Sequence, residues 1–178
     1  MEPPGEAGSE VAAPRVTAEG EPRWLDSDER ATWLSLVSLL TRLPAALDAQ
    51  LQRDAGLSHF DYSVLAGLSE APGGSLRMSV LAALADGSLP RLSQVVARLE
   101  RRGLVRRTPD PDDGRYTLAM LTDAGREAVT AAAPGHVETV RQLVFDPLTK
   151  AKTRQLLDIC RRVLAAVDPA GHCFDQHR

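Results

Sequence analysis

Aromatic residues are scarce in this sequence: they make up 4% of the chain, although hydrophobic residues together account for 43%. A core built from it must therefore be aliphatic and rely on leucine, valine and alanine. Long apolar runs are also missing, since the best stretch, residues 33–43, is short and contains Thr41 and Arg42. A membrane helix needs roughly 18 uninterrupted apolar residues. We therefore expect no membrane span.

Cysteine is nearly absent as well. Only Cys160 and Cys173 occur, which is too few for a disulfide framework. The N-terminus has no basic region that leads into an apolar segment, so it does not look like a signal peptide. At 178 residues the chain suits one domain, or one domain with a tail. These features predict a soluble protein of the cytoplasm.

Sequence motifs of catalysis are missing too. There is no glycine-rich phosphate loop, no His-Glu-x-x-His and no Gly-x-Ser-x-Gly. We therefore predict that the protein is not an enzyme and needs no cofactor. An uncharacterised enzyme and a helical protein-interaction module without DNA binding are the alternatives. Salt-dependent binding to duplex DNA would separate a regulator from both, because only phosphate neutralisation gives a steep salt dependence.

The net charge of −3 is unevenly distributed. Residues 1–23 contain five glutamates and two arginines, and the rest of the chain is balanced. Within that neutral body, residues 88–107 hold six arginines and one glutamate, a local charge of +5. Local charge determines phosphate attraction, because salt screens charges beyond about 8–10 Å. The basic segment is compatible with DNA binding, although a solvated helix face has the same pattern.

Four helices are predicted before residue 104. The first begins at 26–29, carries Trp33 and Leu40 among its apolar residues, is expected to kink at Pro44, and ends at Gly56. The second covers residues from 57 to the break at 72–74, and the third contains Leu81. After the turn 86–88, the fourth covers residues from about 90 to 102 and ends at Gly103. Its predicted buried stripe consists of Leu92, Val95, Val96 and Leu99.

A β-hairpin is predicted directly after these helices. Residues 104–107 and 116–121 have strand character, and the segment between them is rich in aspartate, proline and glycine. A fifth helix is expected to start at Thr122, to be interrupted at Pro134-Gly135 and then to resume. A last helix is expected to begin at Thr149.

Helix, short turn, helix and hairpin in this order predict a winged helix-turn-helix, although a generic three-helix core with a hairpin is the simpler alternative. The second helix of such a motif fits the major groove, where arginine can contact guanine and glutamine can contact adenine. The predicted DNA-contacting residues of the fourth helix are Ser88, Pro90, Arg91, Ser93, Gln94 and Arg98. Those of the hairpin are Arg106, Arg107, Asp113 and Arg115.

The hairpin carries a recognisable pattern. Asp113-Gly114-Arg115 is followed by five residues, then by Leu121-Thr122 and Gly125, and residues 99–107 read Leu-Glu-Arg-Arg-Gly-Leu-Val-Arg-Arg. Both segments resemble the multiple-antibiotic-resistance regulator (MarR) family, and the resemblance covers roughly residues 26–167. One departure is Gly114, which stands where the family often has a second arginine and lowers the charge of the wing.

The resemblance implies a mainly α fold with a small β-hairpin wing, flanked by a helical dimerisation bundle. The expected segments are a disordered tail 1–23, a dimerisation helix 24–56, the DNA-binding domain 57–122, dimerisation helices 123–167 and a tail 168–178. The resemblance further implies a homodimer that binds a short inverted repeat in double-stranded DNA, and a repressor released by a small aromatic effector. It places Arg115 at the wing tip, near the minor groove, with Asp113 orienting it.

Several residues have two interpretations. Trp33, Tyr62 and Arg77 are candidates for an effector crevice, but helical Trp and Tyr more often belong to a core. Cys160 lies at helical spacing among leucine and valine, so we expect a buried small hydrophobe rather than a redox sensor. His172, Cys173 and His177 have no second ligand cluster with recognisable spacing, so no metal site is predicted. The effector, the operator and the direction of regulation stay open.

Overall fold

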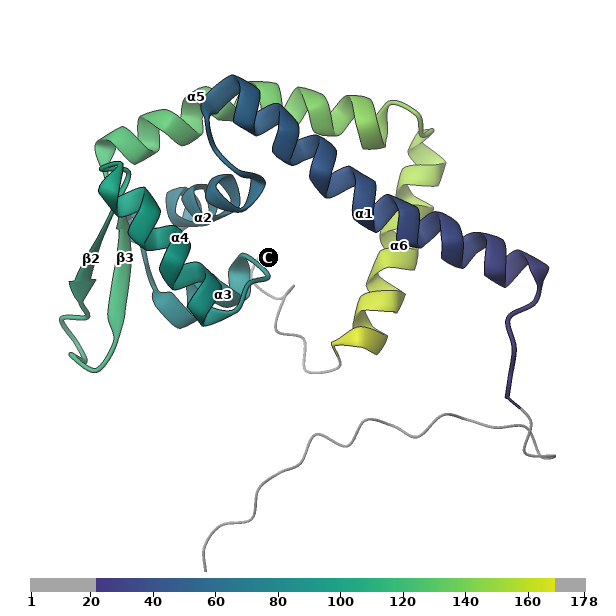
Figure 1. Cartoon of the computed structure of the whole chain (residues 1–178), viewed down its shortest axis with the longest axis horizontal. Coiled ribbons are helices and arrows are strands. Elements are labelled where there is room, and N and C mark those ends of the chain that lie inside the picture. Colours follow the sequence, from purple (N-terminus) through teal and green to yellow (C-terminus); the bar gives the residue numbers. More distant parts are fainter. Residues whose placement is uncertain (1–21, 169–178) are drawn as a thin grey trace, which may run out of the picture. The chain divides into compact units, whose positions relative to one another are not determined.

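The computed structural model describes residues 22–168 (Figure 1). Nearly all of the predicted N-terminal tail, and the candidate ligands His172, Cys173 and His177, lie outside the described residues. The chain has two units, residues 1–40 and 41–178, and the first helix belongs to both. Within residues 22–168, no helix is long and apolar enough to cross a membrane.

The first helix, α1, spans Ser27–Ala55. It begins where predicted, because the Asp26 carboxylate accepts hydrogen bonds from the amides of Asp28 and Glu29, both at 2.8 Å. The helix continues through Pro44 and ends before Gly56, whose φ of 60° favours glycine. All described residues of the first unit are exposed, including Trp33 at 54%. The apolar stripe of this part of α1 therefore has no cover within its own unit.

Helix α2 spans His59–Glu70 and is fixed at its start by a capping box. The Ser58 hydroxyl accepts from the Asp61 amide at 3.0 Å, and the Asp61 carboxylate accepts from the Ser58 amide at 2.9 Å. A 3-10 turn η1 (Pro72–Gly74), a short strand β1 (Ser75–Arg77) and helix α3 (Met78–Leu84) follow. The predicted helix break at residues 72–74 is therefore confirmed.

Helix α4 spans Leu89–Arg101, and all residues of its predicted stripe, Leu92, Val95, Val96 and Leu99, are buried. The chain then turns at Gly103, where φ is 73°. Strands β2 (Val105–Pro109) and β3 (Thr117–Leu121) form the predicted hairpin beside α4 (Figure 1).

The hairpin is part of a larger sheet than the sequence predicts. Strand β1 pairs antiparallel with β3, placing Leu76 opposite Ala119, so the strand order is β1-β3-β2. The sequence analysis treated residues 75–77 only as a lead into the third helix, which is wrong. Three residues are too few to display the alternation of a strand. Their strand conformation follows from pairing with β3, which lies about 40 residues further along the chain.

Helix α5 spans Asp123–Val140 and is continuous through Pro134, so the predicted interruption is wrong. Contacts on both sides of the proline keep the helix in one register. Val129 is buried in the core before it, and after it the His136 ring lies 4.5 Å from the ring of Tyr62. A π-helical segment η2 (Arg141–Phe145) and helix α6 (Lys150–Val167) complete the described fold. The Thr149 hydroxyl caps α6 as predicted.

The core is aliphatic, as predicted, and belongs to the second unit. It combines residues of the C-terminal part of α1 with α2, α3, α4, the sheet and α5; its largest fully buried side chains are Leu51, Leu57, Leu65, Leu68, Leu81, Leu92 and Leu99. Helix α6 contributes no buried residue. The expectation of a buried Cys160 is therefore wrong: the residue is exposed because the apolar face of α6 is uncovered in the single chain.

Candidate nucleic-acid interface

The start of α4 presents the predicted base-contacting residues. The Ser88 hydroxyl accepts from the Arg91 amide at 3.4 Å and Pro90 lies in the first turn, so local sequence fixes where the helix begins. Arg91 and Gln94 are exposed and Ser93 is half-buried, whereas the opposite face belongs to the core. Exposed polar groups on the first turns of such a helix suit contact with base edges in a major groove.

Helix α2 holds two of the arginines of α4. The guanidinium carbon of Arg91 lies 4.2 Å from the centre of the Phe60 ring, a cation–π geometry. The Arg98 guanidinium donates to the Asp61 carboxylate at 2.5 Å, and the Asp61 side chain is 4% exposed. Arg98 therefore has an internal partner that the sequence did not predict, whereas Arg91 forms no ion pair within residues 22–168.

The base of the wing is attached to the end of α4. The Arg107 guanidinium donates twice to the Glu100 carboxylate, at 2.7 and 3.0 Å, and the Arg107 amide donates to it at 3.1 Å. These bonds lower the pKa of Glu100, with the Arg107 side chain as the main cause. Arg106 is exposed, and no ion pair of its side chain occurs within the described part of the chain. Arg106 can therefore bind a phosphate without first breaking an ion pair.

The wing tip carries a highly exposed arginine. Arg115 is bonded to Asp113 through two nitrogens, the shorter bond being 2.6 Å, and its side chain is 84% exposed. The Arg115 side chain is the main cause that lowers the pKa of Asp113. The carboxylate thus restrains the arginine while most of the guanidinium faces solvent.

The three effector candidates have different surroundings. Tyr62 packs on His136, whereas Arg77 is bonded to Asp110 at 2.6 Å and lies over the ring of Tyr116. Trp33 belongs to the other unit and is exposed. The ring partner of Tyr62 thus lies in α5, whereas the partners of Arg77 lie at the ends of the loop between β2 and β3, a difference that sequence spacing alone could not reveal.

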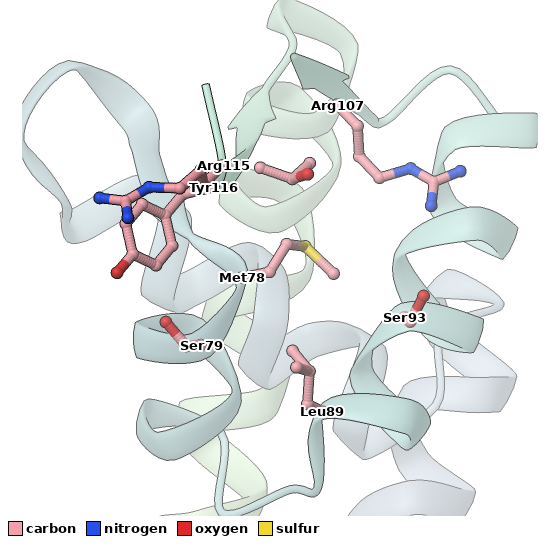
Figure 2. A pocket seen from close by; sticks show the side chains of 8 residues that line it. Met78, Ser79, Leu89, Ser93, Arg107, Arg115 and Tyr116 are labelled. Atoms are coloured by element: carbon pink, nitrogen blue, oxygen red, sulfur yellow. The ribbon is translucent and has the colours of Figure 1, made fainter. Parts of the chain in front are cut away.

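A hollow of about 370 Å³ lies between α4, which is the recognition helix of the motif, and the wing. Figure 2 shows Leu89 and Ser93 of α4 on one side and Arg115 and Tyr116 of the wing on the other, with Met78 between them. Exposed apolar residues, Leu89 at 49% and Tyr116 at 42%, thus lie among hydroxyls and arginines. Such a mixture suits a nucleic acid, whose major groove offers both polar base edges and thymine methyl groups.

A second hollow, of about 880 Å³, lies on the other side of α4, within the second unit. It is lined by the C-terminal part of α1, by the start of α2, by one face of α4 and by the end of α3, and includes Asp48, His59, Phe60, Arg91, Gln94 and Arg98. Its walls therefore share side chains with the predicted DNA-contacting face.

Known transcriptional regulators resemble this chain, some of them over most of its length. A MarR family transcriptional regulator from Streptomyces coelicolor, solved in complex with DNA, is 45% identical, covers 86% of this chain and 96% of its own, and has a TM-score of 0.81. An HTH-type transcriptional regulator from Mycobacterium bovis is 30% identical over 81% of this chain and 97% of its own length. Another from Bacillus subtilis is 37% identical over 42% of this chain. The match spans only half the length of that relative.

A helix-turn-helix followed by a hairpin, with arginines on both, defines a winged helix-turn-helix protein. The sequence model of the MarR family matches residues 55–115, which contain α2, α3, α4 and β2. Together with the relatives above, this match shows that the chain belongs to the MarR family. The resemblance inferred from the sequence, and the mainly helical fold with a small wing, are confirmed.

Proposed function

We propose that this protein is a sequence-specific regulator of transcription that binds double-stranded DNA through α4 and the wing. The observation that carries the proposal is the joint exposure of Arg91 and Gln94 on α4 and of Arg115 at the wing tip. The first two suit base edges in a major groove, and Arg115 suits a phosphate or an adjacent minor groove. The structure of the Streptomyces relative with DNA supports this assignment.

The remaining predicted contacts complete the same face. Ser88, Pro90 and Ser93 flank Arg91 at the start of α4, while Arg106, Arg107 and Asp113 belong to the wing. Phosphate contacts would fix the position of the protein on the duplex, and base contacts would supply the sequence preference. Arg98 would contribute mainly by keeping α4 attached to α2, because its guanidinium is bonded to Asp61.

The proposed active form is a homodimer. In α1, residues 27–40 leave Trp33 at 54% and Leu40 at 63% exposed, and in α6 Ile159 and Val163 are 56% and 48% exposed. Apolar faces of this extent on a soluble chain usually mark an interface. A two-fold dimer would place two copies of α4 on an inverted repeat. We assign residues 57–122 to DNA binding, and 24–56 with 123–167 to dimerisation.

We further propose regulation by a small aromatic effector that releases the protein from DNA, as for a repressor of the cytoplasm. The hollow of about 880 Å³ supports this, because its walls include Arg91 and Gln94. A ligand there would compete with DNA for the same side chains. This hollow takes the place of the crevice expected around Trp33, Tyr62 and Arg77. We propose no catalytic activity, in keeping with a family of transcriptional regulators.

The test is selection of binding sites from random duplexes, performed with the wild type, Arg91→Ala and Arg115→Ala at two salt concentrations. Loss of a base contact should weaken binding by about 1–3 kcal/mol and relax the preference at one position. Loss of a phosphate contact should weaken all sequences alike and reduce the salt slope by about one.

The matched control is Arg162→Gln, which removes an arginine of α6 that is paired with Asp158, is 78% exposed and lies outside the proposed DNA-binding face. It should leave preference and salt slope as they are. If Arg91→Ala and Arg115→Ala also leave affinity, preference and salt slope unchanged, this face does not bind DNA. Sedimentation that shows a monomer at micromolar concentration would overturn the dimer.

A further inference from the structure

Arg77 occupies the junction between the sheet and the helix-turn-helix. It is the last residue of β1 and the residue that precedes α3, and it pairs with Leu118 of β3. Its side chain contacts both ends of the loop between β2 and β3. The Nε atom lies 2.6 Å from Asp110 Oδ2, and the guanidinium carbon lies 4.4 Å from the centre of the Tyr116 ring. One side chain thus connects the helix-turn-helix to both ends of the wing loop.

The wing loop is itself closed at Asp110. The Asp110 amide donates to the Tyr116 carbonyl at 3.0 Å, and the Asp110 carboxylate accepts from the Asp112 amide at 3.0 Å. Its side chain is 5% exposed, so the carboxylate faces little water. The Asp112 amide, and after it the Arg77 side chain, lower the pKa of Asp110. A nearly buried carboxylate in this position needs a cation, and Arg77 supplies it.

The wing is therefore held at two places. Near its base, Arg107 is bonded to Glu100 at the end of α4, and near its tip Arg77 joins Asp110 and Tyr116 to the start of α3. Arg115 lies between Asp110 and Tyr116 in the sequence and projects from the loop that Arg77 closes. The attachment through Arg77 therefore influences the direction in which the Arg115 side chain points.

We infer that Arg77 is a positioning residue, which holds the wing loop against the start of α3 and thereby gives Arg115 a fixed place relative to the recognition helix. The inference rests on the proposed DNA binding. A loop that is already ordered loses less conformational freedom when it binds, so its arginine contributes more of its contact energy to affinity. In this role Arg77 itself needs no contact with DNA or with an effector.

The first test needs no DNA. Arg77→Gln removes the charge and the stack but keeps a polar side chain of similar length. Hydrogen exchange of the amides of residues 110–116 should become about tenfold faster, as local opening rises. The amides of α4 should exchange as in the wild type. Unchanged exchange of the wing loop would overturn the inference, and equally faster exchange throughout α4 would show a general loss of stability instead.

The second test is a double-mutant cycle on the selected duplex. Arg77→Gln should weaken binding about fivefold to tenfold in the wild type, the size expected for the ordering of a loop. In the Arg115→Ala background the same change should cost less than about twofold, because nothing is left for it to position. Equal losses in both backgrounds would mean that Arg77 acts independently of Arg115, which contradicts the inference.

Variants of Tyr116 separate the stack from the ion pair. Tyr116→Phe keeps the aromatic face, so the amides of residues 110–116 should exchange as in the wild type. Tyr116→Leu removes only the stack and leaves the ion pair with Asp110, so it should speed their exchange less than Arg77→Gln does. Arg162→Gln, an equal change of charge on α6, serves as the control. If the wild type binds no duplex, the proposed function fails, while the exchange test still decides whether Arg77 holds the wing loop. If Arg115→Ala weakens binding and Arg77→Gln does not, only the positioning role fails.

Discussion

Replacement of Gly125 by alanine gives the sharpest test of the junction between the wing and α5. Gly125 is buried in the first turn of α5, and an added Cβ would overlap the main-chain carbonyl oxygen of Leu104. It would also lie 2.8 Å from Leu121 Cδ1. A side chain could rotate away, but the carbonyl cannot, because it accepts a hydrogen bond from the Thr122 amide at 3.1 Å. The backbone must therefore move.

The expected cost is the balance of three effects. Overpacking costs about 1–3 kcal/mol. Weakening the bond between Thr122 and Leu104 costs about 1 kcal/mol. Alanine recovers about 1 kcal/mol through its higher helix propensity. The free energy of unfolding should therefore fall by about 2 kcal/mol, and for a chain of this length Tm should fall by about 4–8 °C.

Gly114→Ala is the matched control, because a Cβ there would have no neighbour within 4 Å. Its effect should be close to zero, or slightly stabilising through the unfolded state. Both variants are compared with the wild type by thermal and urea unfolding at one protein concentration, since the proposed dimerisation would make Tm depend on concentration. If Gly125→Ala and Gly114→Ala unfold alike, the close approach of Gly125 to Leu104 does not exist in solution.

Two half-buried histidines, Asp61 and the N-terminal segment are the subjects of three further predictions. Burial is the main cause that lowers the pKa of His59 and His136 below 6.5. As the pH falls through 6.5 the unfolded chain therefore binds protons before the folded chain does, and the free energy of unfolding should fall between pH 7.5 and 5.5. Urea unfolding should show a smaller fall in His136→Gln. Asp61→Asn leaves one acceptor oxygen, which can serve either the α2 capping box or Arg98, so the free energy of unfolding should fall by about 1–2 kcal/mol. Asp158→Asn, which changes an exposed pair on α6, should lower it by less than about 0.5 kcal/mol. Equal losses in the two variants would contradict the role of Asp61. Deletion of residues 1–23 should leave binding to the selected duplex intact, because an acidic segment with few bulky apolar residues neither builds a core nor attracts phosphate; loss of binding would overturn this.

Local signals explain what the sequence could predict of the fold. The stripe of α4, its end at Gly103 and the caps at Thr122 and Thr149 all depend on residues within one or two turns. Two features could not be predicted in this way. Strand β1 exists because β3 pairs with it, and α5 stays continuous at Pro134 because packing on both sides holds it. Tertiary contacts decided both cases against the local pattern.

The candidate site divides along the same line. Residue type and helical spacing suffice to place Arg91 and Gln94 on the outer face of α4, because that face is the complement of the buried stripe. The partners of the arginines are not accessible to such reasoning. Arg98 meets Asp61 across 37 residues, and Arg77 meets Asp110 across 33. No local signal in the sequence reveals that Asp110 is the carboxylate partner of Arg77.

Four arginines of the second unit, Arg77, Arg98, Arg107 and Arg115, already have carboxylate partners at 2.5–2.7 Å. Each carboxylate offsets part of the attraction that its arginine exerts on a phosphate. Binding to random DNA depends on little more than phosphate neutralisation, so this protein should bind random DNA weakly and dissociate from it quickly. A matching site adds base contacts to which the carboxylates are no obstacle. The ion pairs would then shorten the residence time of the protein on non-specific DNA, and the time needed to find an operator would fall.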